Sequence, residues 1–292
     1  MQIFDAHTHL FSQGADGKSI LANMAKAGVC GGCVFSDWPK EANAKVGKDF
    51  EARINGVLAA TKGCDKLYPV MWIHPFEEDI INKVHTAAER GIVAFKIICT
   101  DFYVYDERCL ALLREIASLG KPVFFHTGIL WDGQVSSSYN RPINWESLLD
   151  IKGLRFSMAH VSWPWHDECI ALYGKFLNAQ VTGETAEMFI DMTPGTPDIY
   201  REEVLTKLFR IGYDFEDNLM FGTDCTAESY SFEWAKKWID KDNSIMDKLG
   251  VCERVREKMY GGNLERFLFG DKGDTKKSLP ESDNAHTWDP TK

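Results

Sequence analysis

The alternation of short apolar segments with segments of helical spacing constrains this chain more than any other feature. Eight short stretches are apolar enough to be buried strands, and they cover residues 1–10, 29–35, 67–73, 92–99, 122–126, 154–161, 187–193 and 219–224. Segments with apolar residues three and four apart lie between them, at 16–27, 41–62, 77–90, 106–119, 144–151, 164–177 and 199–211. Eight strands alternating with amphipathic helices predict an α/β fold, the parallel (β/α)8 TIM barrel.

The end of the chain divides into a helical part and a polar part. Further helical spacing is present at 232–239, 244–259 and 263–269, after the last predicted strand. Residues 271–292 are polar and have no hydrophobic period, which is typical of a loose tail. We therefore expect one barrel domain at 1–270, with extra C-terminal helices, and a polar C-terminal tail at 271–292.

Composition excludes several classes of protein. The chain has 292 residues, of which 45% are hydrophobic and 26% are charged, and its formal net charge is -10. An acidic balance argues against a nucleic-acid binder, which normally carries a basic surface. No apolar run is long enough to cross a membrane. We expect a globular protein that binds a small-molecule substrate and neither nucleic acid nor membrane.

Eight cysteines are scattered through apolar segments rather than gathered in a short disulfide framework. The start of the chain has neither the basic residues nor the long apolar stretch of a signal peptide. Both observations favour reduced thiols and a cytoplasmic location. Cys30 and Cys33 are spaced like a redox or zinc dithiol, but they lie inside an apolar segment, and we interpret them as buried structural cysteines.

A His-x-His pair ends the first predicted strand. Alternate residues of a strand point to the same side, so His7 and His9 face one way together. Two adjacent imidazoles are poor core residues, because each needs hydrogen-bond partners, but they are good metal ligands. The alternative is an ordinary pair of loop histidines.

Other strand ends supply further ligand-type side chains. His126 ends the fifth strand, His160 the sixth and Asp224 the eighth. A lone histidine is more often a hydrogen-bonded structural residue, and a lone Asp is often a helix N-cap. In a barrel, however, all these strand ends converge on one mouth. Their joint placement predicts a metal site there.

Several motifs together resemble the amidohydrolase superfamily, in particular its branch that includes the amidohydrolase-related decarboxylases. The resemblance covers about residues 1–270, in order and at sensible spacing. Its motifs are Phe4-Asp5-Ala6-His7-Thr8-His9, Ala94-Phe95-Lys96-Ile97, Gly120-Lys121-Pro122-Val123-Phe124-Phe125-His126-Thr127-Gly128, Ala159-His160-Val161-Ser162, Phe221-Gly222-Thr223-Asp224 and Tyr260-Gly261-Gly262-Asn263-Leu264-Glu265-Arg266-Phe267.

The resemblance implies roles for the matching residues. His7, His9, His126 and Asp224 would bind a divalent metal, usually zinc. The family's sixth-strand histidine, here His160, is either a ligand of a second metal or a catalytic group, and we favour the catalytic role. In binuclear members a carbamylated fourth-strand lysine bridges two metals. Lys96 occupies that strand, so two metals that also use Lys96 and His160 are the alternative to the single Zn²⁺ that we expect.

The expected reaction is hydrolysis of a small carboxylate, lactone or amide. Metal-bound water would have a pKa near roughly 7, Asp224 would take its proton, and His160 would stabilise the oxyanion or protonate the leaving group. The alternative is metal-dependent non-oxidative decarboxylation, with His160 or Asp224 delivering a proton to carbon. The sequence does not separate these reactions. A non-catalytic binding barrel is a minor third hypothesis.

Substrate recognition is expected from residues around the mouth. Arg141, after the fifth strand, could clamp a carboxylate, or it could form an ordinary surface salt bridge. Lys96, His74 and Trp163 are further candidates for substrate binding. Aromatic residues after strand ends could wall a small-molecule pocket or pack between loops. The family resemblance suggests a homodimer.

Overall fold

A computed structural model describes residues 1–11 and 14–271 of the chain. Its strands are all parallel and pair in the order β8-β7-β6-β5-β4-β3-β2-β1-β9. They are β1 Ile3–His9, β2 Val29–Phe35, β3 Leu67–Trp72, β4 Ala94–Ile97, β5 Val123–Phe125, β6 Arg155–Met158, β7 Glu187–Asp191, β8 Leu219–Met220 and β9 Cys225–Thr226. Apart from Asp271, the polar tail expected at 271–292 lies outside the described residues.

The two last strands are parts of one interrupted eighth strand that closes the barrel. β8 pairs with β7, and β9 pairs with β1. Between them, the Ala6 amide donates to the Phe221 carbonyl at 2.9 Å and the Asp224 amide donates to the His7 carbonyl at 2.9 Å. The strand predicted at 219–224 is broken because Asp224 has a left-handed φ of 60°. The closed (β/α)8 barrel is confirmed.

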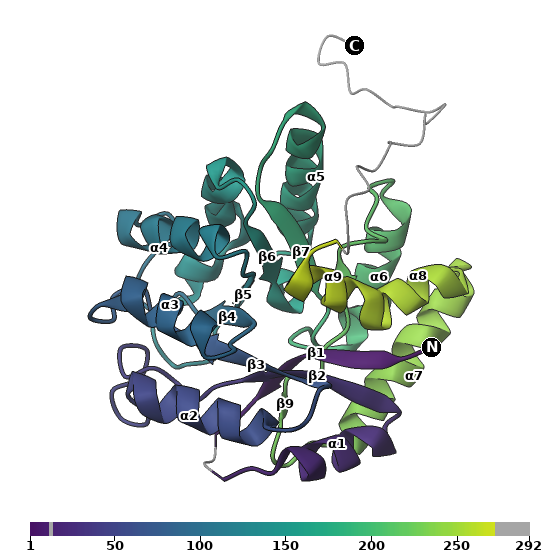
Figure 1. The fold of residues 1–292 in the computed structure, drawn as a ribbon. Helices are drawn as coiled ribbons and strands as arrows, with labels where there is room; N and C mark the ends of the chain where they lie inside the picture. The colour runs from purple at the N-terminus through teal and green to yellow at the C-terminus, as the bar shows by residue number, and fades with distance from the viewer. Residues whose placement is uncertain (12–13, 272–292) are drawn as a thin grey trace.

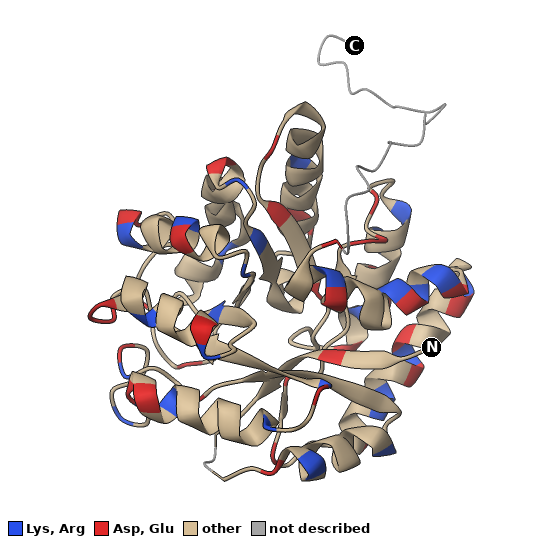
Figure 2. Cartoon of the chain, viewed as in Figure 1, with Lys and Arg blue, Asp and Glu red and all other residues tan. Residues whose placement is uncertain are grey.

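Helices surround the strands (Figure 1). The α-helices are α1 Gly17–Lys26, α2 Phe50–Thr61, α3 Ile80–Glu89, α4 Glu107–Ser118, α5 His166–Thr182, α6 Arg201–Arg210, α7 Phe232–Leu249, α8 Glu253–Glu257 and α9 Asn263–Phe269. Shorter helical turns are η1 Ser137–Asn140, η2 Pro142–Asp150, η3 Ala159–Ser162, η4 Asp198–Tyr200 and η5 Lys258–Gly262. Charged residues of both signs are interspersed along the outer helices, and most of the strand surface is uncharged (Figure 2). No described helix has the length and apolar character needed to cross a membrane.

Four of the predicted helical segments differ from the structure in extent or type. Residues 41–49 are turns, because the helix begins only at Phe50, where the Asp49 carboxylate caps it by accepting from the Ala52 amide. The segment predicted at 232–239 and the first part of that at 244–259 are joined in α7, which continues to Leu249 and ends at Gly250 with φ 68°. The rest of the second segment forms α8 and the start of η5. The helix predicted at 144–151 is the 3₁₀ helix η2.

The base of the barrel is filled by apolar side chains, while its mouth is polar. Inside the strands a compact cluster includes Phe35, Phe124 and Phe189. Phe267 of α9 reaches this cluster from below, with ring centroids 4.7 Å from Phe124 and 4.9 Å from Phe189. The C-terminal helices therefore plug the centre of the base. All eight cysteines are free, with Cys33 buried and Cys30 half-buried as structural cysteines.

Candidate active site

All six residues predicted for catalysis or metal binding line one cavity of about 290 Å³ at the C-terminal ends of the strands. His7 and His9 come from β1 and Lys96 from β4, where the alternation of the strand turns all three inward. The other three follow strand ends and are His126, His160 and Asp224. Parallel strands in a closed barrel thus bring together side chains that are more than 200 positions apart in the sequence, as for His7 and Asp224.

Three of these residues form a compact group of metal-ligand type. Nε2 of His9 lies 3.2 Å from Nε2 of His7 and 3.2 Å from Oδ1 of Asp224, and His7 Nε2 lies 3.6 Å from the same oxygen. One ligand atom from each residue falls within 4.8 Å of the others. Nδ1 of His9 is buried and has no hydrogen-bond partner among the described residues. Two imidazoles and a carboxylate at this spacing fit a divalent metal.

His126, the fourth predicted ligand, lies in the same cavity but outside this group. Its ring centroid is 5.0 Å from that of His160, and its Nε2 is 3.3 Å from the Ile129 carbonyl, to which it donates. Its Nδ1 is therefore the unprotonated nitrogen of the neutral ring. Its role as a ligand stays a prediction.

Asp191 is a site residue that the sequence analysis did not identify. It is the last residue of β7, it is fully buried, and its Oδ2 lies 2.5 Å from Nδ1 of His7. Its other oxygen accepts from the Thr193 amide at 2.8 Å and from the Thr193 hydroxyl. The signal that could have found it is its position: like His126 and Asp224, Asp191 stands where a strand ends at the mouth.

His160 is held in a strained turn. Three consecutive non-glycine residues there have left-handed backbone angles, with φ 62° at His160, 45° at Val161 and 58° at Ser162. Such conformations cost free energy and cluster at functional sites. Nδ1 of His160 lies 3.3 Å from the Thr193 carbonyl, and a Cβ on Gly195 would come within 2.5 Å of the imidazole ring. Only glycine fits against this ring.

Burial keeps three histidines of the cavity, His7, His126 and His160, neutral. It lowers the pKa of His7 to about 4, assisted by the charge of Lys96 and opposed by Asp191. Burial also lowers the pKa of His160, and it lowers that of His126 well below the usual range, assisted by His160. Neutral imidazole is the form that binds metals.

The charged groups of the cavity compensate one another. Burial lowers the pKa of Lys96 to about 8, although Asp191 and Asp224 oppose the shift. Burial would raise the pKa of Asp224, but the hydrogen bond from His9 and the nearby His7 and His160 hold it well below its ordinary value. Asp224, whose side chain is 40% exposed, is thus a carboxylate that water in the cavity can reach.

Aromatic rings form much of the cavity wall. Trp163, a predicted substrate-binding residue, lines the cavity and stacks on Trp131, with ring centroids 6.1 Å apart. Trp38 and Trp72 meet at 4.5 Å elsewhere in the lining. These rings suit a small organic substrate with an apolar part.

The two other predicted substrate-binding residues lie outside the cavity lining. Arg141 is half-exposed and its Nε pairs with the Glu168 carboxylate at 2.9 Å, so the surface salt bridge, and not the carboxylate clamp, is what forms. His74 is buried among loops, where Nε2 lies 3.4 Å from Asp101 and the ring packs against Phe102. Neither side chain lines the cavity at the mouth, and a role of either residue in substrate binding stays a prediction.

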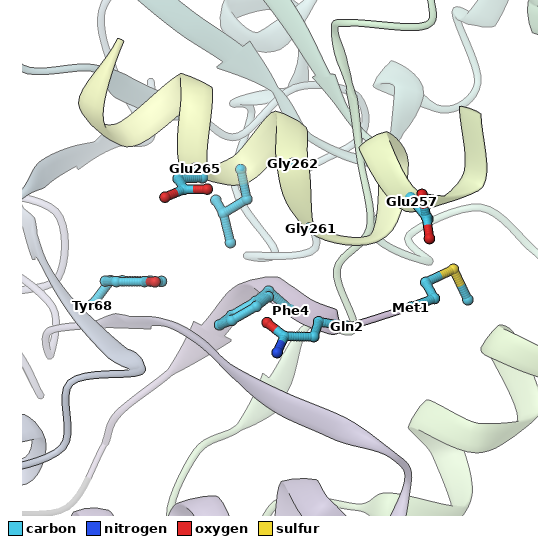
Figure 3. Close-up of a pocket in the computed structure, with 9 residues that line it drawn as sticks. Met1, Gln2, Phe4, Tyr68, Glu257, Gly261, Gly262 and Glu265 are labelled. Carbon is cyan, nitrogen blue, oxygen red and sulfur yellow. The ribbon is translucent and has the colours of Figure 1, made fainter. Parts of the chain in front are cut away.

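A second cavity, of about 260 Å³, lies at the opposite end of the strands, between β1 and the C-terminal helices (Figure 3). Phe4 and Tyr68 form its floor, and its two carboxylates, Glu257 and Glu265, stand on different sides (Figure 3). Its lining includes neither a histidine nor a group of metal-ligand type. The candidate active site is therefore at the mouth.

Comparison with known proteins establishes the fold. No protein-family model matches the chain, and no curated protein sequence matches it. Among solved structures, it is similar to one described as a probable 2-pyrone-4,6-dicarboxylic acid hydrolase, from Acinetobacter baumannii with citric acid bound (TM-score 0.61, 14% identity, covering 93% of this chain and 100% of that one). It is also similar to 2,6-dihydroxybenzoate decarboxylase from Rhizobium (TM-score 0.58, 14% identity, covering 92% and 99%).

A third similar structure is amidohydrolase 2 from Bifidobacterium longum subsp. infantis (TM-score 0.56, 13% identity, covering 93% and 100%). All three likenesses extend over nearly the whole of both chains. This chain therefore has the TIM-barrel fold of the amidohydrolase structures, which include both a hydrolase and a decarboxylase.

Proposed function

We propose that this protein is a metal-dependent hydrolase that acts on a small carboxylate, lactone or amide substrate at the mouth of the barrel. The observation that carries the proposal is the group formed by His7, His9 and Asp224, whose ligand atoms lie within 4.8 Å of one another. The likeness to amidohydrolase structures, one of them a hydrolase, supports the same reading.

His7, His9 and Asp224 would hold one divalent metal, with His126 as the fourth ligand, and Zn²⁺ suits this donor set best. When bound, the metal supplies a Lewis acid and lowers the pKa of a water ligand toward roughly 7. The alternative is a two-metal site that also uses Lys96 and His160. Zinc content per chain and intact mass separate the two, because a carbamylated Lys96 adds the mass of carbon dioxide.

The protein's own residues divide the proton transfers between them. Asp224 is ionised and partly exposed to the cavity, so it can accept the proton of the attacking water. His160 is the catalytic histidine. It is neutral at rest, so it first takes up at Nε2 the proton that Asp224 accepts, and then stabilises the developing oxyanion or protonates the leaving group. Trp163 would contact the substrate, and Lys96 offers it a buried cation.

A second candidate is non-oxidative decarboxylation. The likeness to 2,6-dihydroxybenzoate decarboxylase and the aromatic wall of the cavity favour it, because an apolar wall excludes water from a carbanion. His160 or Asp224 would then deliver the proton to carbon. Release of carbon dioxide, against release of ring-opened or amide-cleavage products, distinguishes the two reactions. A barrel that only binds its ligand would release neither kind of product.

The decisive experiment combines metal analysis with a screen of esters, lactones, amides and carboxylates. We expect about one equivalent of zinc per chain, loss of turnover on chelation and its return with Zn²⁺. Asp224→Asn should lower kcat by about 100-fold or more, the effect of losing a general base. The matched control is Asp240→Asn, a change at an exposed carboxylate that pairs with Lys236 on α7 and does not line the cavity. A fully active, metal-free Asp224→Asn protein would overturn the proposal.

Two coarser expectations belong with this proposal. A homodimer is inferred from the family resemblance, and light scattering after gel filtration measures it directly. A cytoplasmic location agrees with eight free cysteines, because reducing compartments keep thiols unpaired. Fractionation of the source cells tests it.

A further inference from the structure

The last residue of β7 and the residues after it contact two histidines of the candidate site. This segment, Asp191 to Gly195, is here called the β7 turn. Asp191 contacts His7 at Nδ1, and the Thr193 carbonyl contacts His160 at Nδ1. One turn thus reaches a candidate metal ligand and the candidate catalytic histidine.

The chemistry of these two contacts fixes which nitrogen carries the proton. An ionised carboxylate and a backbone carbonyl can only accept hydrogen bonds, so Nδ1 must be the donor in both rings. A neutral imidazole with a proton on Nδ1 has a lone pair on Nε2. The Lys96 ammonium supports this for His7, because it is a pure donor and its Nζ lies 3.4 Å from His7 Nε2.

The turn itself is held rigidly from outside the cavity. Arg201 donates through Nη1 to the Met192 carbonyl at 2.6 Å and pairs with Asp242 at 2.6 Å, and both of these charged residues are buried. Within the turn, the Gly195 amide donates to the Thr193 carbonyl at 2.8 Å. The acceptors for His7 and His160 therefore have fixed positions before any ligand binds.

We propose that the β7 turn is a positioning element that sets the Nδ1–H tautomer of both His7 and His160, so that each ring keeps an unprotonated Nε2. Asp191 is its positioning residue for the candidate metal ligand, and Thr193 together with Gly195 holds the candidate catalytic histidine. The inference deepens the proposed function, on which its consequence for metal binding rests. Partners of this kind orient ligands and raise their basicity in metal sites.

The first test needs no substrate. Long-range proton–nitrogen NMR correlation on the ¹⁵N-labelled full chain, before and after addition of Zn²⁺, reports the tautomer of each histidine. His7→Gln and His160→Gln assign the signals by their disappearance. We expect Nδ1–H in both rings without metal. A wild-type chain in which His7 carries its proton on Nε2 would overturn the inference.

The second test is Zn²⁺ affinity, measured by competition with a chromophoric chelator. In Asp191→Asn the side-chain amide can donate to Nδ1 of His7, which moves the ring proton to Nε2, so affinity should fall about 10–100-fold. Glu115→Gln is the matched control, since Glu115 pairs with His85 at 2.7 Å on the outer helices. The control should bind Zn²⁺ as the wild type does.

Two milder variants guard against misfolding of Asp191→Asn. Thr193→Val removes the hydroxyl that donates to Asp191 and should weaken Zn²⁺ binding several-fold, while Thr193→Ser restores a hydroxyl and should restore the affinity. A folded Asp191→Asn protein that binds Zn²⁺ as tightly as wild type contradicts the positioning role. If the wild type has both Nδ1–H tautomers but does not bind Zn²⁺, the positioning role is still supported. The missing Zn²⁺ binding would overturn the proposed function instead.

Discussion

Charged groups of both signs lie around the two nitrogens of His7. Asp191 lies at Nδ1, Lys96 lies near Nε2, and all three residues are buried. A buried charge is tolerated only when it is paired or neutralised. The histidine between the two charges responds by staying neutral, since its pKa falls to about 4. Burial, which would destabilise an isolated ion, here keeps His7 unprotonated and therefore able to bind a metal.

Asp5 behaves differently, because burial outweighs its hydrogen bonds. It accepts from Tyr230 at 2.9 Å and from the amides of His7 and Thr223 at 3.0 Å, and it joins β1 to the interrupted eighth strand. Burial nevertheless raises its pKa to about 7. Its native form is therefore protonated below that pH.

The raised pKa of Asp5 predicts a pH dependence of stability. The carboxyl is protonated in the native state up to about pH 7 but ionises near 3.8 when unfolded, so its stabilising contribution is lost as pH rises between these values. Asp5→Asn removes this titration and keeps the shape. Relative to the wild type, the free energy of unfolding of the Asp5→Asn protein should rise by at most about 1.4 kcal/mol per pH unit between about pH 4 and 7.

Urea unfolding of both proteins at pH 5 and pH 7 measures the effect. Subtracting the two curves removes the contribution of His7, which titrates in both proteins. A stability difference that is the same at both pH values would show that Asp5 does not have its raised pKa.

At the scale of elements, a glycine in the left-handed conformation ends helix α7. α7 ends at Gly250, whose φ is 68° and whose surroundings leave open space for a Cβ. Gly56 also has room for a Cβ, but it lies inside α2 with ordinary helical geometry. The two positions differ in backbone conformation and not in packing.

This contrast gives a matched prediction. Gly250→Ala should lower the free energy of unfolding by about 1–2 kcal/mol, the cost of a left-handed L-residue. Gly56→Ala should raise it by up to about 1 kcal/mol, because alanine loses less entropy in a helix. Thermal and urea unfolding of both variants measure the changes. Equal effects of the two substitutions would contradict the assigned helix end.

The elements that sequence predicted well are those fixed by local pattern. The strand predicted at 29–35 has the bounds of β2, because both faces of a barrel strand are buried and its apolar run is therefore continuous. The helix predicted from residue 41 starts only at Phe50, because the apolar spacing extends upstream of Asp49, the residue that caps the helix. Phe50 packs in the core, whereas the turns before it owe their shape to loop hydrogen bonds.

The candidate site divides in the same way. His7 and Asp224 could be predicted because strand order in a barrel fixes where strand ends meet. Arg141 and His74 could not, because loop conformation depends on tertiary partners such as Glu168 and Phe102 that no periodicity encodes. Asp191 lay within a predicted strand, so its place at the mouth depended on where β7 ends.

For the whole molecule, closure links the two ends of the described chain. β1 pairs with β9, and α9 fills the base with Leu264, Phe267 and Leu268. The cavity at the mouth depends on this plug, because the same inner cluster includes Phe35, whose ring lies 4.7 Å from that of His7. We infer that the functional domain extends through residue 270 and needs no part of 271–292.

Truncation and one core substitution test this boundary together. Deleting residues 272–292 should change the free energy of unfolding by less than about 0.5 kcal/mol. Phe267→Ala should cost about 3–5 kcal/mol, since it empties the centre of the plug. Phe269→Ala, two residues along the same helix but 51% exposed, is the control and should cost less than about 1 kcal/mol.

Zinc content and unfolding midpoints of the four proteins decide the outcome. The truncated chain and Phe269→Ala should keep the metal content of the full chain, because both leave every described residue of the inner cluster in place. Phe267→Ala should lose zinc at a lower temperature, because loosening the base frees the strands that carry His7 and Asp224. If the truncated chain unfolds or releases its metal as Phe267→Ala does, the tail is part of the domain and the boundary at residue 270 is wrong.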